Sequence, residues 1–156
     1  MKILFVCTGN TCRSPMAEAI AAEAARGTNR DLFFSSAGTS ARAASPASEH
    51  AVSVAEENGL DLSNHASRPV RADTLAEADL VLTMTRSHKK ILSDEYNAYA
   101  GKIFTIFEYA DGSDGEITDP FGGGREDYNI CFLQLKGLIG TLITKIADEA
   151  GEGESQ

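Results

Sequence analysis

The sequence predicts an α/β fold, a three-layer sandwich in which a central four-stranded parallel sheet carries helices on both faces. Short apolar runs alternate along the chain with segments of helical periodicity, which is the order of strand–helix–strand units with right-handed crossovers. The runs are almost wholly apolar rather than alternating, as in strands that are buried on both faces. The length of 156 residues favours one domain, which we expect to span residues 1–150.

The first strand and the first helix carry the clearest local signals. Residues 2–7, KILFVC, form an apolar run that predicts a buried parallel strand. A helix is expected to follow, because Ser14 suits the N-cap and Pro15 suits the first helical position. Gly27 is a typical stop signal, so this helix is expected to end near residue 26.

Turn residues and apolar periodicity delimit the remaining elements. Apolar residues at helical spacing between Leu135 and Ile146 predict a long last helix, and a loop rich in Gly and Asp precedes it. The last six residues, 151–156, are expected to be a flexible tail. The further strands are expected at 31–36, 80–85 and 102–107, and the further helices at 45–59, 73–78, 87–96 and 126–150. This order indicates a doubly wound, flavodoxin-like sheet, with ligands beyond the carboxyl ends of the strands.

Composition and charge exclude several classes of partner. Hydrophobic residues make up 42% and charged residues 24%, as in soluble globular proteins. The formal net charge of −9 argues against nucleic acid or an anionic membrane as a general partner, because both need a basic face. We find no uninterrupted apolar run of about 18 residues. Polar residues interrupt the first apolar run too early for a signal peptide, so a cytoplasmic location is expected. Three cysteines are too few and odd in number for a disulfide framework.

The stretch CTGNTCRS joins the first strand to the first helix. Backbone amides of such a loop turn inward around an anion, and the helix N-terminus adds its positive dipole end. Arg13 adds a planar fork for two oxygens of one phosphate. Cys7 at the floor of this cradle is expected to have a pKa below the free value of about 8.5. A buried structural cysteine is the ordinary alternative, and a nucleotide-binding P-loop is excluded because no Gly-Lys-Ser/Thr follows.

The segment VCTGNTCRSPMAEA closely resembles the active-site signature of the low-molecular-weight protein tyrosine phosphatase family. The resemblance extends over nearly the whole chain, and the family's late Asp-Pro pair appears as Asp119-Pro120 in TDPFGGG. It implies a cysteine-dependent phosphatase that uses neither metal nor cofactor, with phosphorylated proteins as its substrates.

By this resemblance, Cys7 is the nucleophile that forms a phosphocysteine, and Arg13 binds the phosphoryl oxygens. Ser14 hydrogen-bonds the sulfur, Asn10 organises the loop, and Asp119 is the general acid and later the general base. The implied phosphate-binding set is Thr8, Gly9, Asn10, Thr11, Cys12, Arg13 and Ser14.

Cys12 is a second candidate for chemistry. The family often protects its nucleophile by a reversible disulfide between the positions of Cys7 and Cys12, so the resemblance implies a redox pair here. The alternative is that Cys12 is a packed small residue. Cys131 falls in the last helix and is expected in the core.

Thr11 and Phe121 carry the information on substrate. Together with CTGNTCRSPMAEA and DPFGG they resemble the bacterial branch of the family that acts on protein phosphoarginine. The Thr11 hydroxyl is expected near the scissile phosphoramidate, and Phe121 is expected to wall the flat guanidinium. Three alternatives stay open: a phosphotyrosine phosphatase, a catalytically dead phosphate-binding module, and an arsenate reductase. The last is disfavoured because residues 13–130 contain no further cysteine.

The three histidines show no metal-ligand spacing, and each is expected to be structural. His65 lies in a segment, SNHASRP, that resembles one which supports the family's phosphate loop. Tyr128 is expected to pack in the core or at the pocket rim. The oligomeric state is not readable from the chain.

Overall fold

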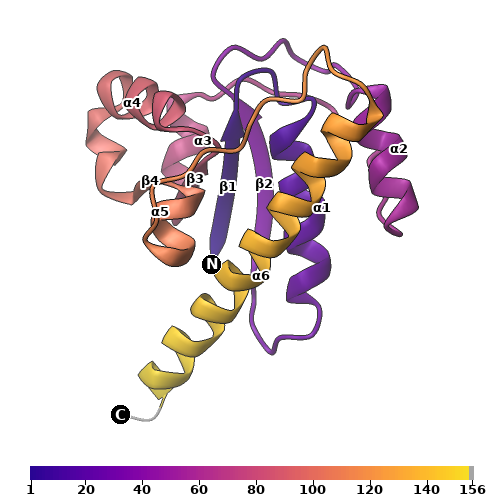
Figure 1. Cartoon of the computed structure of the whole chain (residues 1–156). Helices are drawn as coiled ribbons and strands as arrows, with labels where there is room; N and C mark the ends of the chain where they lie inside the picture. Colours follow the sequence, from indigo (N-terminus) through magenta and orange to yellow (C-terminus); the bar gives the residue numbers. More distant parts are fainter. Residues whose placement is uncertain (155–156) are drawn as a thin grey trace.

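A four-stranded, wholly parallel sheet in the order β2-β1-β3-β4 forms the centre of the computed structural model, which describes residues 1–154. The strands are β1 (Lys2–Cys7), β2 (Phe33–Gly38), β3 (Leu80–Thr83) and β4 (Ile103–Thr105). The fold class predicted from the sequence is confirmed, since helices cover both faces of this sheet (Figure 1).

Alternation along β1 divides its side chains between two cores. Ile3, Phe5 and Cys7 face the larger core, which contains the buried side chains of α1, α2, α5 and α6. Leu4 and Val6 face a smaller core, which contains buried side chains of α3 and α4. The helices are α1 (Arg13–Ala25), α2 (Glu49–Glu57), α3 (Ala72–Glu77), α4 (Arg86–Glu95), the 3-10 helix η1 (Asn97–Lys102), α5 (Ile106–Asp111) and α6 (Arg125–Glu154).

The fourth strand is shorter than predicted, and the helix α5 was not predicted. The apolar run at 102–107 was interpreted as one strand, yet the chain turns helical at Ile106. Thr105 is the N-cap of α5, and its hydroxyl accepts from the backbone of Glu108 while the Glu108 carboxylate accepts from the Thr105 backbone. This capping box satisfies two amides at the helix start and outweighs the β propensity of the run.

Other boundaries differ by a few residues. The strand expected at 31–36 lies at Phe33–Gly38, and the helix expected from residue 45 begins at Glu49. Helix α6 continues to Glu154, so residues 151–154 of the expected tail are helical; residues 155–156 lie outside the described part. A glycine disfavours helix by only about 1 kcal/mol, which is too little to end a long helix that is already nucleated.

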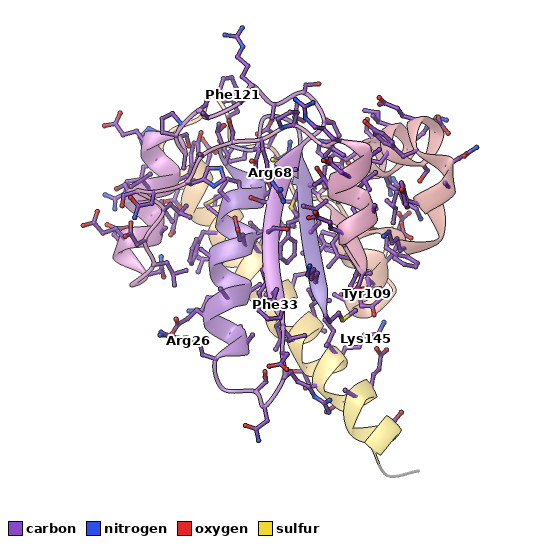
Figure 2. All side chains as sticks on the ribbon, turned by 180° about the vertical axis from the view of Figure 1, so that it is seen from behind. Arg26, Phe33, Arg68, Tyr109, Phe121 and Lys145 are labelled. Carbon is purple, nitrogen blue, oxygen red and sulfur yellow. The ribbon has the colours of Figure 1, made fainter. Side chains whose placement is uncertain are left out.

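Helix α6 is long and apolar enough to pass the length and composition test for a membrane span, with a mean hydropathy of 1.5 over an 18-residue window. One face of the helix packs in the larger core, where Leu135, Ile139 and Leu142 are fully buried, while Ile130 and Leu133 are exposed. Lys145 joins α6 to α5 by donating to the carbonyl of Tyr109 at 2.6 Å, near the lower end of the molecule (Figure 2).

Candidate active site

The loop between β1 and α1 is held from outside through its carbonyl oxygens. Its carbonyl oxygens accept hydrogen bonds from the surrounding protein: Cys7 from Thr39, Thr8 from Ser40, Asn10 from His65, Thr11 from Ser48, and Cys12 from Met16. In a planar trans peptide the N–H points opposite to the C=O. The amides that follow these carbonyls are therefore turned away from those partners, which is the arrangement predicted for an anion cradle.

Asn10 holds the loop in its unusual backbone conformation. Its φ of 56° lies in the left-handed region, which Asn adopts more readily than most residues. The buried side chain donates to Ser14 Oγ at 2.7 Å and accepts from the Arg68 backbone at 3.0 Å. The Asn10 carbonyl and His65 Nε2 are 2.7 Å apart. His65 thus supports the loop as the sequence comparison with the family implied.

Cys7 and Ser14 are buried and in contact. Their sulfur and oxygen atoms lie 2.9 Å apart. Because Ser14 Oγ already accepts from Asn10, its own hydrogen is available to the Cys7 sulfur, and the competing carbonyl of Ala37 is farther away at 3.5 Å. The Ser14 hydroxyl is thus placed to donate to the Cys7 sulfur.

Arg13 is almost fully buried at the first position of α1. One terminal nitrogen donates to the carbonyl of Ile117 at 3.1 Å. The other lies 3.4 Å from Thr8 Oγ1 and 3.4 Å from a carboxylate oxygen of Asp119. The guanidinium therefore connects the loop to the segment between α5 and α6, which crosses the carboxyl ends of the strands (Figure 1).

A cavity of about 180 Å³ lies against this loop. The side chain of Asp119 is half exposed at its mouth, and Phe121 is 76% exposed beside it, at the upper edge of the molecule in Figure 2. The Phe121 backbone donates to Asp119 Oδ1 at 3.1 Å, which orients the carboxylate. The cavity is lined by Cys7, Thr8, Gly9, Thr11, Cys12, Arg13, Asp119 and Phe121.

Every residue predicted for the site is thus found in one place. Eight of them line the cavity, while Asn10 and Ser14 lie buried behind the loop and act through its geometry. A larger cavity of about 530 Å³ lies between α1, β2 and residues 61–65, and it contains none of the candidate catalytic residues.

Cys12 is also held by hydroxyl groups from distant parts of the chain. Its sulfur lies 3.3 Å from the Tyr128 hydroxyl and 3.4 Å from Ser48 Oγ. Burial raises the pKa of Tyr128 to about 12, so this phenol is neutral at physiological pH. Tyr128 also contacts the His50 ring, with centroids 5.3 Å apart. Cys131 is buried as expected, and burial raises the pKa of its thiol to about 12.

His88 is the contact that the sequence interpretation missed. Its Nε2 lies 2.8 Å from Thr8 Oγ1 and its Nδ1 lies 2.9 Å from Thr85 Oγ1. Burial, together with the nearby charge of Arg13, lowers the pKa of His88 to about 4. The imidazole is therefore neutral at physiological pH. The sequence gives little indication of this contact. It indicates only that Thr85 can be the N-cap of the helix that contains His88.

Comparison with known proteins agrees with this geometry. Residues 2–152 match the family described as low molecular weight phosphotyrosine protein phosphatase. The chain is 41% identical to the protein-arginine-phosphatase of Bacillus subtilis strain 168, over 94% of this chain and 97% of that protein.

Two solved structures are closely similar. One is the YwlE arginine phosphatase as a C7S mutant with a phosphorylated active-site serine, with a TM-score of 0.91, 40% identity, and coverage of 94% of this chain and 95% of that chain. The other is a low molecular weight protein tyrosine phosphatase from T. tengcongensis, with a TM-score of 0.89, 46% identity, and coverage of 93% and 99%. On the family match over residues 2–152 and the identity to these relatives, this chain belongs to the low molecular weight phosphotyrosine protein phosphatase family.

Proposed function

We propose that this protein is a cysteine-dependent phosphatase that hydrolyses phosphoarginine in proteins through a phosphocysteine intermediate. The observation that carries the proposal is the single cavity in which the Cys7 sulfur, the Arg13 guanidinium and the Asp119 carboxyl meet. The three free cysteines of the described chain fit a reducing compartment, which supports the expected cytoplasmic location.

Catalysis proceeds in two displacements. The Cys7 thiolate attacks phosphorus, the bond from phosphorus to the leaving nitrogen breaks, and Asp119 gives that nitrogen its proton. A water then attacks the phosphocysteine, Asp119 takes a proton from this water, and the S–P bond breaks to return the thiolate. Arg13 and the loop amides hold the phosphoryl oxygens throughout, which supplies electrostatic stabilisation from groups that are already in place.

The first test asks whether the site is catalytic or only binds phosphate. Cys7→Ser is expected to abolish hydrolysis of p-nitrophenyl phosphate while inorganic phosphate still binds. Cys131→Ala is the matched control, because this buried thiol lies outside the cavity around Cys7, and it is expected to keep its activity. A parent protein that binds inorganic phosphate but hydrolyses nothing would support a binding module instead, whereas full activity in Cys7→Ser would show that Cys7 is not the nucleophile.

The phosphoarginine assignment depends on the cavity wall. Thr11 brings a hydroxyl to the lining, and Phe121 is the single aromatic ring at the mouth, followed by three glycines. The similarity to protein-arginine-phosphatases supports this substrate. The tyrosine phosphatase of T. tengcongensis, at 46% identity, keeps phosphotyrosine as the second candidate.

Substrate choice is tested by comparing kcat/KM on phosphoarginine and phosphotyrosine peptides of one sequence. The parent is expected to prefer phosphoarginine, and Thr11→Ile is expected to reduce that preference by about one to two decades, because a polar contact is lost in a closed pocket. Thr141→Ile, on an exposed position of α6, is the control. Preference of the parent for phosphotyrosine would assign the second candidate.

We also propose that Cys7 and Cys12 form a reversible disulfide under oxidation, since both thiols are free and line the same cavity. Hydrogen peroxide would oxidise Cys7 to a sulfenic acid, and attack by the Cys12 thiol would release water and form the S–S bond. Thiol reagents are expected to restore full activity to the oxidised parent but not to oxidised Cys12→Ser. Equal recovery in both proteins would contradict the redox pair.

A further inference from the structure

The ring of His88 connects helix α4 to the phosphate loop. It is about 5% exposed, and it reaches Thr8 Oγ1 across 80 positions of sequence at a distance of 2.8 Å. His88 does not line the cavity, whereas Thr8 does. Whatever His88 contributes to the site therefore passes through Thr8.

The hydrogen bonds around Thr85 indicate which ring nitrogen of His88 carries the proton. Thr85 Oγ1 accepts from the backbone N–H of His88 at 3.2 Å as the N-cap of α4. Its own hydrogen then has Nδ1 of His88 as its acceptor, at 2.9 Å. In a neutral imidazole one nitrogen accepts and the other donates, so the arrangement in which Thr85 donates to Nδ1 places the hydrogen on Nε2, which donates to Thr8.

This arrangement occupies the Thr8 oxygen with donors from two sides. It accepts from His88 Nε2 at 2.8 Å and lies 3.4 Å from the donating nitrogen of Arg13. With both lone pairs engaged, the hydroxyl hydrogen of Thr8 has no partner among these groups. Because Thr8 lines the same cavity as Cys7, that hydrogen is available to an oxygen of a bound phosphoryl group.

We propose that His88 is a positioning residue of the phosphate site, which holds the Thr8 hydroxyl so that it donates to the bound phosphoryl group and keeps Arg13 in place. This inference rests on the proposed function only in that the cavity binds a phosphoryl group. A purely structural role would require only that His88 is buried between α4 and the rest of the protein. The effect of mutating His88 would then not depend on whether Thr8 is present.

A double-mutant cycle separates these roles, with Kd for inorganic phosphate and kcat/KM for p-nitrophenyl phosphate as readouts. His88→Asn retains a polar group near Thr85 but is too short to reach Thr8. His88→Gln restores an amide donor near the position of Nε2. Thr8→Val removes the hydroxyl at nearly constant shape, and Thr8→Ser keeps it. Thermal unfolding of each variant reports on folding separately.

We expect His88→Asn and Thr8→Val each to weaken phosphate binding about tenfold, as for loss of one charge-assisted hydrogen bond. His88→Gln and Thr8→Ser are expected to recover most of this loss. In the Thr8→Val background, His88→Asn is expected to change the Kd less than about twofold, because the group through which it acts is gone. In ¹⁵N NMR spectra of the parent, Nε2 is expected to be the protonated nitrogen of His88.

Equal loss on adding His88→Asn to the parent and to Thr8→Val would overturn the inference, as would an unchanged Kd in His88→Asn. These outcomes are distinct from failure of the proposed function. A parent that binds phosphate with the expected coupling but hydrolyses no substrate would refute the phosphatase and leave the positioning role intact. A parent that binds no phosphate would refute both.

Discussion

Asn10 combines backbone strain with complete burial. A left-handed conformation of a residue with a side chain disfavours folding by about 1 kcal/mol or more, and it persists only where the surroundings enforce it. Here three hydrogen bonds hold Asn10 in this conformation. His65 contacts its carbonyl oxygen, the Arg68 backbone contacts its Oδ1, and Ser14 contacts its Nδ2. The contact from Asn10 also orients the Ser14 hydroxyl toward the Cys7 sulfur. The shape of the loop and the position of this hydroxyl therefore both depend on Asn10.

Asn10→Ala is therefore expected to lower the free energy of unfolding by about 2–4 kcal/mol, through lost hydrogen bonds and an unfavourable φ. Asn10→Gly, which tolerates that φ, is expected to recover part of the stability but not the phosphate affinity. Urea denaturation measures the first quantity. Asn64→Ala, at an exposed position, is the control, and an effect of equal size there would show that Asn10 has no special role.

For Asp119 we propose a chemical rather than an architectural role. Its side chain is half exposed, and its contacts are the Arg13 guanidinium and the Phe121 backbone. Asp119→Ala is expected to reduce kcat by about 10²–10⁴-fold, the usual contribution of a general acid, with little change in phosphate affinity or stability. Asp148→Ala, on the exposed face of α6, serves as the control. Wild-type turnover in Asp119→Ala would remove Asp119 from the mechanism.

The end of β2 matters at the scale of the element, because it supports the phosphate loop from the side. Gly38 pairs with Cys7 in the sheet register, and the next two residues donate to the carbonyls of Cys7 and Thr8. A Cβ on Gly38 would lie 2.4 Å from the Thr8 carbonyl oxygen and 3.0 Å from the Asn10 nitrogen. Both are backbone atoms of the loop, so no side chain can move aside to relieve the contact.

Gly38→Ala is expected to destabilise the protein by about 1–3 kcal/mol, as for other overpacked sites, and to weaken phosphate binding because the loop must shift. Gly140→Ala provides the matched control. Its Cβ would meet nothing within 4 Å inside α6, so this change is expected to be neutral or stabilising by up to about 1 kcal/mol. Retention of full phosphate affinity in Gly38→Ala would show that β2 does not support the loop.

At the scale of the whole molecule, the neutral state of His88 makes stability depend on pH. Burial, with Arg13, lowers the pKa of His88 from 6.5 to about 4, although Asp119 and Glu116 act in the opposite direction. Between these values the unfolded state binds a proton that the folded state does not. The free energy of unfolding contributed by this group is therefore fully present above about pH 6.5 and is lost as the pH falls toward about 4.

Chemical denaturation between pH 7.5 and pH 4.5 measures this dependence, with about three intermediate pH values sufficient to define the slope. The parent is expected to lose stability on acidification more steeply than His88→Gln, which lacks the imidazole of His88 but keeps the other titratable groups. Identical slopes in the two proteins would contradict the assignment of a buried neutral imidazole.

The elements that the sequence predicted well are those whose signals are local. β1, the loop and α1 follow one another, and their apolar run and cysteine–arginine spacing lie within the first 27 residues. The predicted cap was wrong, because Cys12 and not Ser14 is the N-cap, and Arg13 and not Pro15 begins α1. The helix α5 was missed although Thr105 and Glu108 have capping-box spacing, because an apolar run of six residues fits a buried strand equally well. Whether such a segment becomes strand or helix depends on the balance between sheet pairing and helix capping in the folded protein.

By itself, the sequence determined the parallel α/β order, the thiol at the end of the first strand and the anion-binding loop after it, because each depends on residues that are neighbours in the chain. Asp119 and His65 were expected at the site only through the family resemblance, and only the tertiary structure decided which atoms of the distant groups meet. Asp119 meets Arg13, His88 meets Thr8, His65 meets Asn10, and Tyr128 meets Cys12, over separations of 106, 80, 55 and 116 positions. The physical reason is that parallel strands with right-handed crossovers bring their carboxyl ends to one edge of the sheet, where loops far apart in sequence converge.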